Sequence, residues 1–230
     1  AGGTGNLVSG NLMNGVGLAG TSTGDLVQGN FVGVNAGGTA ALGNGLSGVM
    51  LNGASGNVIG AGNVLSGNQQ DGITIFGASN NRIESSLIGT DWTGTYAIAN
   101  REDGVYLQDG SNNTIGGGAP GAGNLISGNS WSGVSLAGTG SGNRVQGNYI
   151  GTDGTGNVAI GNAQAGVYLS ITGPTMVGGT AADESNRIAY NGWDGVAIMS
   201  GAGHSVLGNE IHSNRSEEHT SELQSLTNLV

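Results

Sequence analysis

The chain has 230 residues, of which 50 are glycine and 2 are proline, with 9% charged residues and a formal net charge of −10. It contains no lysine and no cysteine, which counts against a nucleic-acid partner and excludes disulfides and thiolate metal sites. No apolar stretch reaches the length of a membrane span, so we expect no membrane insertion.

The sequence repeats at intervals of about 60 residues. Blocks begin with GNLVSGN at Gly5, GNVLSGN at Gly62, GNLISGN at Gly123 and SNRIAYN at Ser185. Each block holds two smaller units, whose spacing indicates a base of about 24 residues plus insertions. Each unit contains three short apolar segments, ending in G-[VI]-x-[LI], with β-branched residues at alternate positions. These segments predict strands.

Three short strands per unit predict a solenoid in which equivalent strands stack in parallel at about 4.8 Å per coil. Alignment of the units gives apolar columns that no polar residue interrupts. The first two columns are Val27, Ile59, Ile83, Ile115, Val145, Val177 and Val206, and Val8, Val32, Leu65, Ile88, Ile126, Ile150, Ile188 and Ile211. The third segment supplies Val16, Val49, Ile73, Val105, Val134, Val167 and Val196, with Leu18, Leu51, Ile75, Leu107, Leu136, Leu169 and Ile198. We expect all of these side chains to point inward.

A further column is almost entirely asparagine. Its members are Asn6, Asn30, Asn63, Asn124, Asn148, Asn186 and Asn209, with Ser86 as the exception. Asparagine tolerates left-handed backbone angles at a sharp corner, and its amide can bond the equivalent amide one coil away. Because buried amides need partners, we expect an internal asparagine ladder with a structural role.

The pattern N-x-I-x-G-N with G-V-x-L resembles the right-handed parallel β-helix repeat proteins of the bacterial surface and secreted type. The insertions IGTDWTGTYAIAN and IGTDGTGNVAIGN resemble those of large proteins of that kind. The resemblance covers residues 1–214 and implies an all-β, right-handed parallel β-helix of about seven coils, located outside the cell or on its surface. It leaves function open, because such proteins include polysaccharide lyases and hydrolases, adhesins, phage tailspikes and scaffolds.

Residues 215–230 do not continue the repeat. A further G-[VI]-x-[LI] segment is expected near Glu218, nine residues after Asn209, and it does not occur. The letters RSEEHTSELQSLTNLV resemble a translated sequencing adapter, so we interpret residues 215–230 as a non-native tail that is disordered or loosely packed. The alternative is a natural cap over the end strands. On the first interpretation, residues 1–214 are a β-helix fragment truncated at both ends.

Two acids precede the glycine of the third segment on adjacent coils. Asp71 and Asp103 should therefore lie about 5 Å apart, a spacing that raises a carboxyl pKa or holds a cation such as Ca²⁺. The same position is filled elsewhere by Asn14, Ser47, Ser132 and Ala165, which suits an ordinary turn. Arg101, Glu102 and Asp103 form the one acidic and basic trio that suggests catalysis, and a solvated surface ion pair is the simpler interpretation. We expect no cofactor, with calcium at the two acids as the alternative.

Four aromatic residues recur two coils apart. Tyr106 and Tyr168 occupy an outward column of the third strand, and Trp131 and Trp193 share a turn column, giving a repeat of about 10 Å. That repeat is comparable to a disaccharide step and predicts a glycan-binding strip; the alternative is isolated surface aromatics without a role.

From these residues we expect a structural or adhesin-like scaffold, rather than an enzyme, with a polysaccharide or cell-surface glycan as partner. The alternative function is a polysaccharide lyase or glycoside hydrolase fragment whose catalytic coils are partly missing. The sequence does not determine the oligomeric state.

Overall fold

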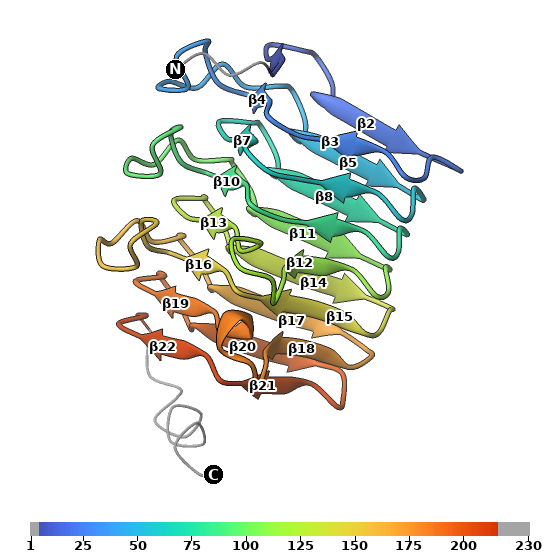
Figure 1. Cartoon of the computed structure of the whole chain (residues 1–230), viewed down its shortest axis with the longest axis vertical. Helices are drawn as coiled ribbons and strands as arrows, with labels where there is room; N and C mark the ends of the chain where they lie inside the picture. Colours follow the sequence, from blue (N-terminus) through green and yellow to red (C-terminus); the bar gives the residue numbers. More distant parts are fainter. Residues whose placement is uncertain (1–4, 216–230) are drawn as a thin grey trace.

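The computed structural model describes residues 5–215, which form a parallel β-helix (Figure 1). Each coil contributes one short strand to each of three parallel sheets, so the expected all-β solenoid is confirmed. The sheets hold eight, seven and seven strands, in agreement with about seven coils. We number the coils 1 to 8 after the strands of the eight-stranded sheet.

The strands follow the three segments of each repeat unit. Sheet A contains β1 (Leu7–Val8), β4 (Phe31–Val32), β7 (Val64–Leu65), β10 (Leu87–Ile88), β13 (Leu125–Ile126), β16 (Tyr149–Ile150), β19 (Arg187–Ala189) and β22 (Glu210–His212). Sheet B contains β2 (Val16–Ala19), β5 (Val49–Asn52), β8 (Ile73–Phe76), β11 (Val105–Gln108), β14 (Val134–Gly138), β17 (Val167–Ile171) and β20 (Val196–Ser200). Sheet C contains β3 (Leu26–Val27), β6 (Val58–Ile59), β9 (Arg82–Ile83), β12 (Thr114–Gly116), β15 (Asn143–Gln146), β18 (Thr175–Gly178) and β21 (Ser205–Leu207). A single turn of 3-10 helix, η1 (Ala182–Glu184), lies between β18 and β19.

The interior is one continuous apolar core built from the predicted columns. All three sheets direct one or two residues per strand into it, and most of these side chains are fully buried. Residues of the terminal coils are partly buried, and Ile198 is the most exposed, at 41%, in the last strand of sheet B, where the register to β17 shifts after Leu169.

The glycine of G-V-x-L is required by close packing between coils. A Cβ added to Gly104 would lie 2.6 Å from the carbonyl oxygen of Gly133 and 2.5 Å from Cγ2 of Ile126. No side chain fits there, so the glycine lets successive coils approach to hydrogen-bonding distance.

The predicted asparagine ladder is present at the corner between sheets C and A. In its regular part, Asn124 Nδ2 donates to Asn148 Oδ1 at 3.0 Å, and Asn148 Nδ2 donates to Asn186 Oδ1 at 2.9 Å. At the one interruption, the hydroxyl of Ser86 donates instead to the carbonyl oxygen of Gly60. The ladder therefore satisfies buried amides along the whole stack.

Two further asparagine ladders were not predicted. The corner between sheets A and B carries Asn11, Asn44, Asn68, Asn100, Asn129, Asn162, Asn191 and Asn214. The corner between sheets B and C carries Asn57, Asn81, Asn113 and Asn143. The recurring S-G-N triplet ends on a ladder asparagine at both corners, as at Asn11 and Asn57. All three corners are thus closed by stacked amides.

Inserted loops at residues 33–43, 89–99 and 151–161 project from coils 2, 4 and 6, on the left of Figure 1. Each is closed by a short antiparallel bridge, such as Thr90 with Ala97. In the second loop, Asp91 Oδ1 accepts hydrogen bonds from the backbone nitrogens of Thr95 and Tyr96, both at 2.9 Å. The acids of T-D-x-T-G therefore shape turns, as their sequence context indicates.

The inserted loops cover part of the outer face of sheet A and build a second, small apolar core there. It contains Val34, Val64 and Ile98, with Phe31 and Leu87 packed against it. Val64 and Leu125, two outward residues of this sheet, are consequently buried, whereas the outward residues of sheet B are not covered by any inserted loop within residues 5–215.

Most of the tail, residues 216–230, lies outside the described part of the chain, and the adapter interpretation stays a prediction. Arg215 is described, and its backbone nitrogen donates to the carbonyl oxygen of Asn191 at 2.9 Å. Across residues 5–215, no helix is long and apolar enough to cross a membrane.

Candidate functional site

The two predicted tyrosines lie on the outer face of sheet B. Tyr106 on β11 and Tyr168 on β17 both pair with Ser135 on the intervening strand β14, so they lie two coils apart in one column. Both rings are half-buried. At about 4.8 Å per coil, their separation along the axis is about 10 Å.

The two predicted tryptophans lie in the turn that leads into sheet B. The backbone nitrogen of Gln164 donates to Trp131 O at 3.0 Å, and that of Trp193 donates to Gln164 O at 3.1 Å. Trp131 and Trp193 are therefore also two coils apart in one column, and they are 46% and 49% exposed.

The two columns are staggered, because their aromatic residues belong to alternate coils. Successive coils 4 to 7 each carry one ring, from the tyrosine column and the tryptophan column in turn. We call this set the aromatic track: Tyr106, Trp131, Tyr168 and Trp193. The four residues and both periods were predicted from the sequence, and the stagger follows from the register of the coils.

The two predicted aspartates stack directly upon one another at the coil 4 end of the aromatic track. The backbone nitrogen of Asp103 donates to Asp71 Oδ1 at 3.0 Å, and that of Ser132 donates to Asp103 Oδ1 at 2.8 Å. The Thr74 hydroxyl donates to Asp71 Oδ2 at 2.6 Å, and the Ser135 hydroxyl bonds Asp103. We call Asp71 and Asp103 the acid pair.

Burial gives the acid pair unusual protonation behaviour. Asp71 and Asp103 are 4% and 5% exposed. Loss of hydration raises the pKa of Asp71 to about 7, and the negative charge of Asp103 adds to the effect. Loss of hydration likewise raises the pKa of Asp103 to about 6, against hydrogen bonds from Ser135 and Ser132 that lower it. Near neutral pH the pair therefore exchanges protons, as a general acid or base must.

The structural role of the acid pair does not require charge. In coil 1 the same corner position holds Asn14, whose Oδ1 accepts a hydrogen bond from the backbone nitrogen of Ser47 at 3.1 Å. An amide therefore serves the turn as well as a carboxylate does. Two buried acids in adjacent coils lower the stability of the folded state at neutral pH. Ionisable groups that are retained at such a cost are typical of functional sites.

The other predicted catalytic residues surround the acid pair without forming the expected ion pair. Arg101 is exposed, and no ion pair within residues 5–215 joins it to Glu102 or Asp103. Burial raises the pKa of Glu102 as well. The Tyr106 hydroxyl donates to Gln108 Oε1 at 3.0 Å, and burial together with the nearby acids raises the pKa of Tyr106. A tyrosine and several acids thus lie around one point of the outer face.

The acid pair offers few side chains that could coordinate a metal ion. The described residues contain no group of three or more histidines, cysteines, aspartates and glutamates arranged to hold a metal. The oxygens of Asp71 already accept hydrogen bonds from Asp103 and Thr74. Calcium binding at the acid pair stays a prediction.

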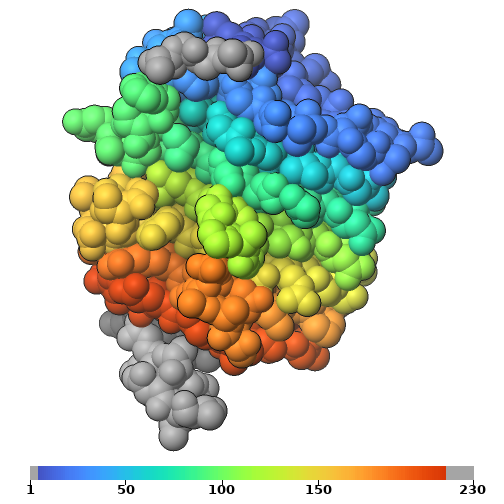
Figure 2. All heavy atoms as spheres, in the orientation of Figure 1, coloured from blue at the N-terminus to red at the C-terminus, as the bar shows by residue number. Residues whose placement is uncertain are grey.

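A concave site at the corner between sheets C and A was not predicted from the sequence. The chain makes longer connections from sheet C to sheet A at residues 117–124 and 179–186, in coils 5 and 7, and a short one in coil 6. Figure 2 shows the two connections protruding one above the other. Between them lies a pocket of about 340 Å³, which we call the corner notch, with Gly147, Asn148 and Tyr149 among its lining residues.

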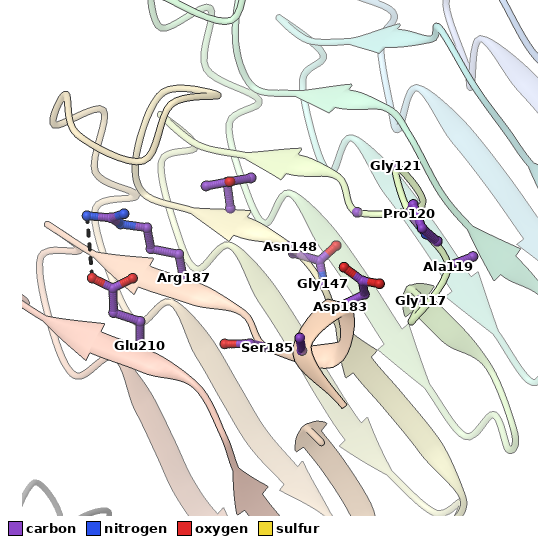
Figure 3. Close-up of a pocket in the computed structure, with 13 residues that line it drawn as sticks. Gly117, Ala119, Pro120, Gly121, Gly147, Asn148, Asp183, Ser185, Arg187 and Glu210 are labelled. Atoms are coloured by element: carbon purple, nitrogen blue, oxygen red, sulfur yellow. Dashed lines mark ion pairs between the residues drawn. The ribbon is translucent and has the colours of Figure 1, made fainter. Parts of the chain in front are cut away.

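Charged side chains line the corner notch from two sides (Figure 3). Arg187 and Glu210 form an ion pair, with Arg187 Nη2 and Glu210 Oε1 3.4 Å apart. Asp183, on η1, places its carboxylate between the two connections. The corner notch could have been predicted from the alternation of long and short connections between sheets C and A, because a short connection between two long ones leaves a gap.

Comparisons with known proteins agree with the β-helix fold. The family model described as the right handed beta helix region matches residues 3–224. The search of the curated proteins gave no match. Among solved structures, the chain is similar to the periplasmic alginate epimerase AlgG, with 16% sequence identity and a TM-score of 0.50 over 87% of this chain and 36% of that one. It is also similar to the A-module of the mannuronan C-5 epimerase AlgE4 of Azotobacter vinelandii, with 13% identity and a TM-score of 0.46 over 92% of this chain and 50% of that one.

These similarities concern the fold. The chain spans only about a third of the AlgG structure that it matches, 36% by residue coverage. At 16% identity, the similarity shows a shared fold and does not show a shared activity.

Proposed function

The chain belongs to the right-handed β-helix family, and from this premise we propose that it is an extracellular, cell-surface or periplasmic domain that binds a polysaccharide along the outer face of sheet B. The aromatic track carries the proposal, because it presents one ring per coil over four successive coils. Aromatic side chains offer large rigid contact surfaces at low entropic cost, and a sugar presents an apolar face to stack on them.

The periodicity of the aromatic track suits a polymer. Rings of one column recur at about 10 Å, comparable to a disaccharide, and the backbone ladder holds them in fixed register. A rigid array that matches the ligand repeat loses little entropy on binding. An extended glycan can therefore contact several rings at once, which raises its affinity over that of a short oligosaccharide.

Charge favours an uncharged or positively charged polysaccharide over a polyanion. The whole chain carries a formal charge of −10. The acid pair and Glu102 lie beside the aromatic track, and Arg101 directly precedes Glu102 in the chain. A polyanionic glycan would meet like charge along this face, with a cost in both affinity and association rate.

Binding to a panel of neutral and charged polysaccharides, followed by affinity electrophoresis and calorimetry, tests the proposal. We expect Trp131→Ala and Tyr168→Ala each to weaken binding of the best polysaccharide by about tenfold, or about 1.4 kcal/mol. The matched control is Trp92→Ala, because Trp92 is also 46% exposed but lies on an inserted loop away from the aromatic track. Equal losses in all three variants, or no loss in any, would contradict the proposal.

The acid pair favours a second candidate function, the enzymatic modification of the bound polysaccharide. Asp71 and Asp103 exchange protons near neutral pH and lie beside the Tyr106 hydroxyl, at one end of the aromatic track. A sugar held on Tyr106 would receive a proton at its glycosidic oxygen, or lose one from a ring carbon. Tyr106 would touch the substrate. As an acid it would give its hydroxyl proton to the glycosidic oxygen while that C–O bond breaks and water adds, and a protonated aspartate would restore the hydroxyl; as a base it would take the ring-carbon proton while passing its own proton to an ionised aspartate.

Activity on the polysaccharide that the wild-type protein binds separates the two functions. An enzyme would release reducing ends, form an unsaturated product or exchange a ring proton with solvent deuterium, and Asp71→Asn would abolish that change while retaining binding. If the wild-type protein binds the polysaccharide and leaves it unchanged by all three readouts, the binding function stands and the enzymatic one is excluded.

A further inference from the structure

We propose that the corner notch is a second binding site, independent of sheet B, and that it takes a sugar bearing a free amino group. The corner notch lies between sheets C and A, whereas the aromatic track lies on sheet B and the turn before it. The two sites share no residue, so a ligand in one leaves the other accessible.

The size of the corner notch suits a small polar ligand. Its volume of about 340 Å³ lies at the lower end of the range for small-molecule sites. One wall consists largely of glycine, including Gly117, Gly121 and Gly123. Glycine exposes backbone N–H and C=O groups without side-chain obstruction, and these are suitable partners for sugar hydroxyls.

The charges of the corner notch favour a cation. Arg187 is engaged by Glu210 at 3.4 Å, and its Nη2 also lies 3.5 Å from Asn157 Oδ1. Asp183 has no ion-pair partner within residues 5–215. The lining therefore carries one unbalanced negative charge, which attracts an ammonium group. A uronic acid would bring its carboxylate next to Asp183 and Glu210 and be repelled.

Tyr149 supplies an aromatic surface held in place by the neighbouring loop. A Cβ added to Gly156 would lie 3.0 Å from the Tyr149 ring and 2.5 Å from Cδ of Arg187, so the loop at 151–161 packs closely on both side chains. Tyr149 nevertheless keeps 37% of its surface exposed and lines the corner notch. A fixed ring stacks on a sugar or receives an ammonium group over its face without further ordering.

Titration of the whole protein with D-glucosamine, followed by NMR or calorimetry, tests this assignment. The matched probes are N-acetylglucosamine, which lacks the positive charge, and glucuronic acid, which carries the opposite one. We expect glucosamine to bind at least tenfold more tightly than either, with an affinity that falls as salt is added.

Variants locate the binding. Asp183→Asn preserves the shape of the side chain and should lower glucosamine affinity about tenfold, and Tyr149→Ala should lower it further. Trp131→Ala, on the aromatic track, should leave it unchanged, so that failure of this site is distinguishable from failure of the sheet B surface. Three results would overturn the proposal: unchanged affinity in Asp183→Asn, equal binding of N-acetylglucosamine, or tighter binding of lysine methyl ester, which would indicate a basic peptide as the ligand.

Discussion

The outer faces of sheets A and B begin from the same backbone pattern and differ in whether inserted loops pack on them. On sheet A, the outward column reads Phe31, Val64, Leu87 and Leu125 over coils 2 to 5, and the inserted loops cover it. On sheet B, the corresponding outward column reads Met50, Thr74, Tyr106, Ser135 and Tyr168, with no inserted loop over it in the described chain. The difference indicates that outward side chains of this β-helix build a second core where an inserted loop packs on them, and that they stay available for the proposed ligand where no such loop does.

The largest effect should come from the covered face. Leu125 is 5% exposed, and its Cδ2 lies 2.7 Å from where a Cβ on Gly94 would be, directly beneath an inserted loop. Leu125→Ala removes buried contacts and leaves a cavity, so we expect a loss of about 2–4 kcal/mol in the free energy of unfolding. Urea denaturation measures it. Polysaccharide affinity should not change, and a loss of affinity without a loss of stability would reverse the roles assigned to the two faces.

The next effect concerns the acid pair and depends on pH. Because the pKa of Asp71 is raised from 3.8 to about 7, the folded state holds a proton that the unfolded state releases, and stability from this group is present below about pH 4 and lost as pH rises through about 7. Asp71→Asn retains the acceptor for the Asp103 backbone nitrogen, as Asn14 does for Ser47. We therefore expect the variant to be more stable than wild type by about 1–3 kcal/mol at pH 8, below the limit of about 4 kcal/mol set by three pKa units.

The measurement is the difference between the two unfolding free energies as a function of pH. That difference should shrink as the pH falls and vanish below about pH 3, where wild-type Asp71 is protonated in both the folded and the unfolded state. A difference that is constant from pH 4 to pH 8 would show that Asp71 does not carry the raised pKa.

A smaller effect on stability separates the open face from the covered one. Tyr168 is half-buried on the outer side of β17, with Ser135 and Ala197 as its lateral neighbours. Tyr168→Ala should change the free energy of unfolding by less than about 1 kcal/mol, far less than Leu125→Ala, although it weakens polysaccharide binding. A larger destabilisation would make Tyr168 a structural residue and remove it from the aromatic track.

The smallest effect is expected from calcium. A cation at the acid pair must displace the hydrogen bonds that Asp71 accepts from Thr74 and Asp103. We expect millimolar Ca²⁺ to raise the melting temperature of wild type slightly, through stabilisation of the ionised pair, and to have no effect on Asp71→Asn. An equal shift in both proteins would place calcium elsewhere.

The sequence predicted many features of this fold that repeat with the coil, although two of the three asparagine ladders were missed. The columns of Val, Ile and Leu, the first asparagine ladder and the stacking of Asp71 on Asp103 all depend only on the register of one coil upon the next. Parallel stacking places equivalent residues side by side, so alignment of the repeats was sufficient to find them.

Features that depend on the inserted loops were not predicted. The burial of Val64 and Leu125 on an outward column requires the loops to fold back over sheet A, and no repeat position encodes that contact. The corner notch likewise arises from two loops that belong to different coils. The expected surface ion pair of Arg101 was also wrong. The Asp103 carboxylate accepts a hydrogen bond from the backbone nitrogen of Ser132 on the next coil, and no ion pair joins it to Arg101 within residues 5–215.

The alternation of loops has a consequence for how such a chain can change in length. Loops occur on coils 2, 4 and 6 at one corner and on coils 5 and 7 at another, and the aromatic track changes column with every coil. The surface features of the molecule therefore repeat every two coils. Adding or removing one coil would keep every asparagine ladder and the whole apolar core intact. It would nevertheless shift the loops and aromatic residues beyond that point by one coil, so that they would no longer alternate in step with those before it. Growth that preserves the surface must proceed two coils at a time, and two coils are the interval at which the GN-x-x-SGN blocks recur in the sequence.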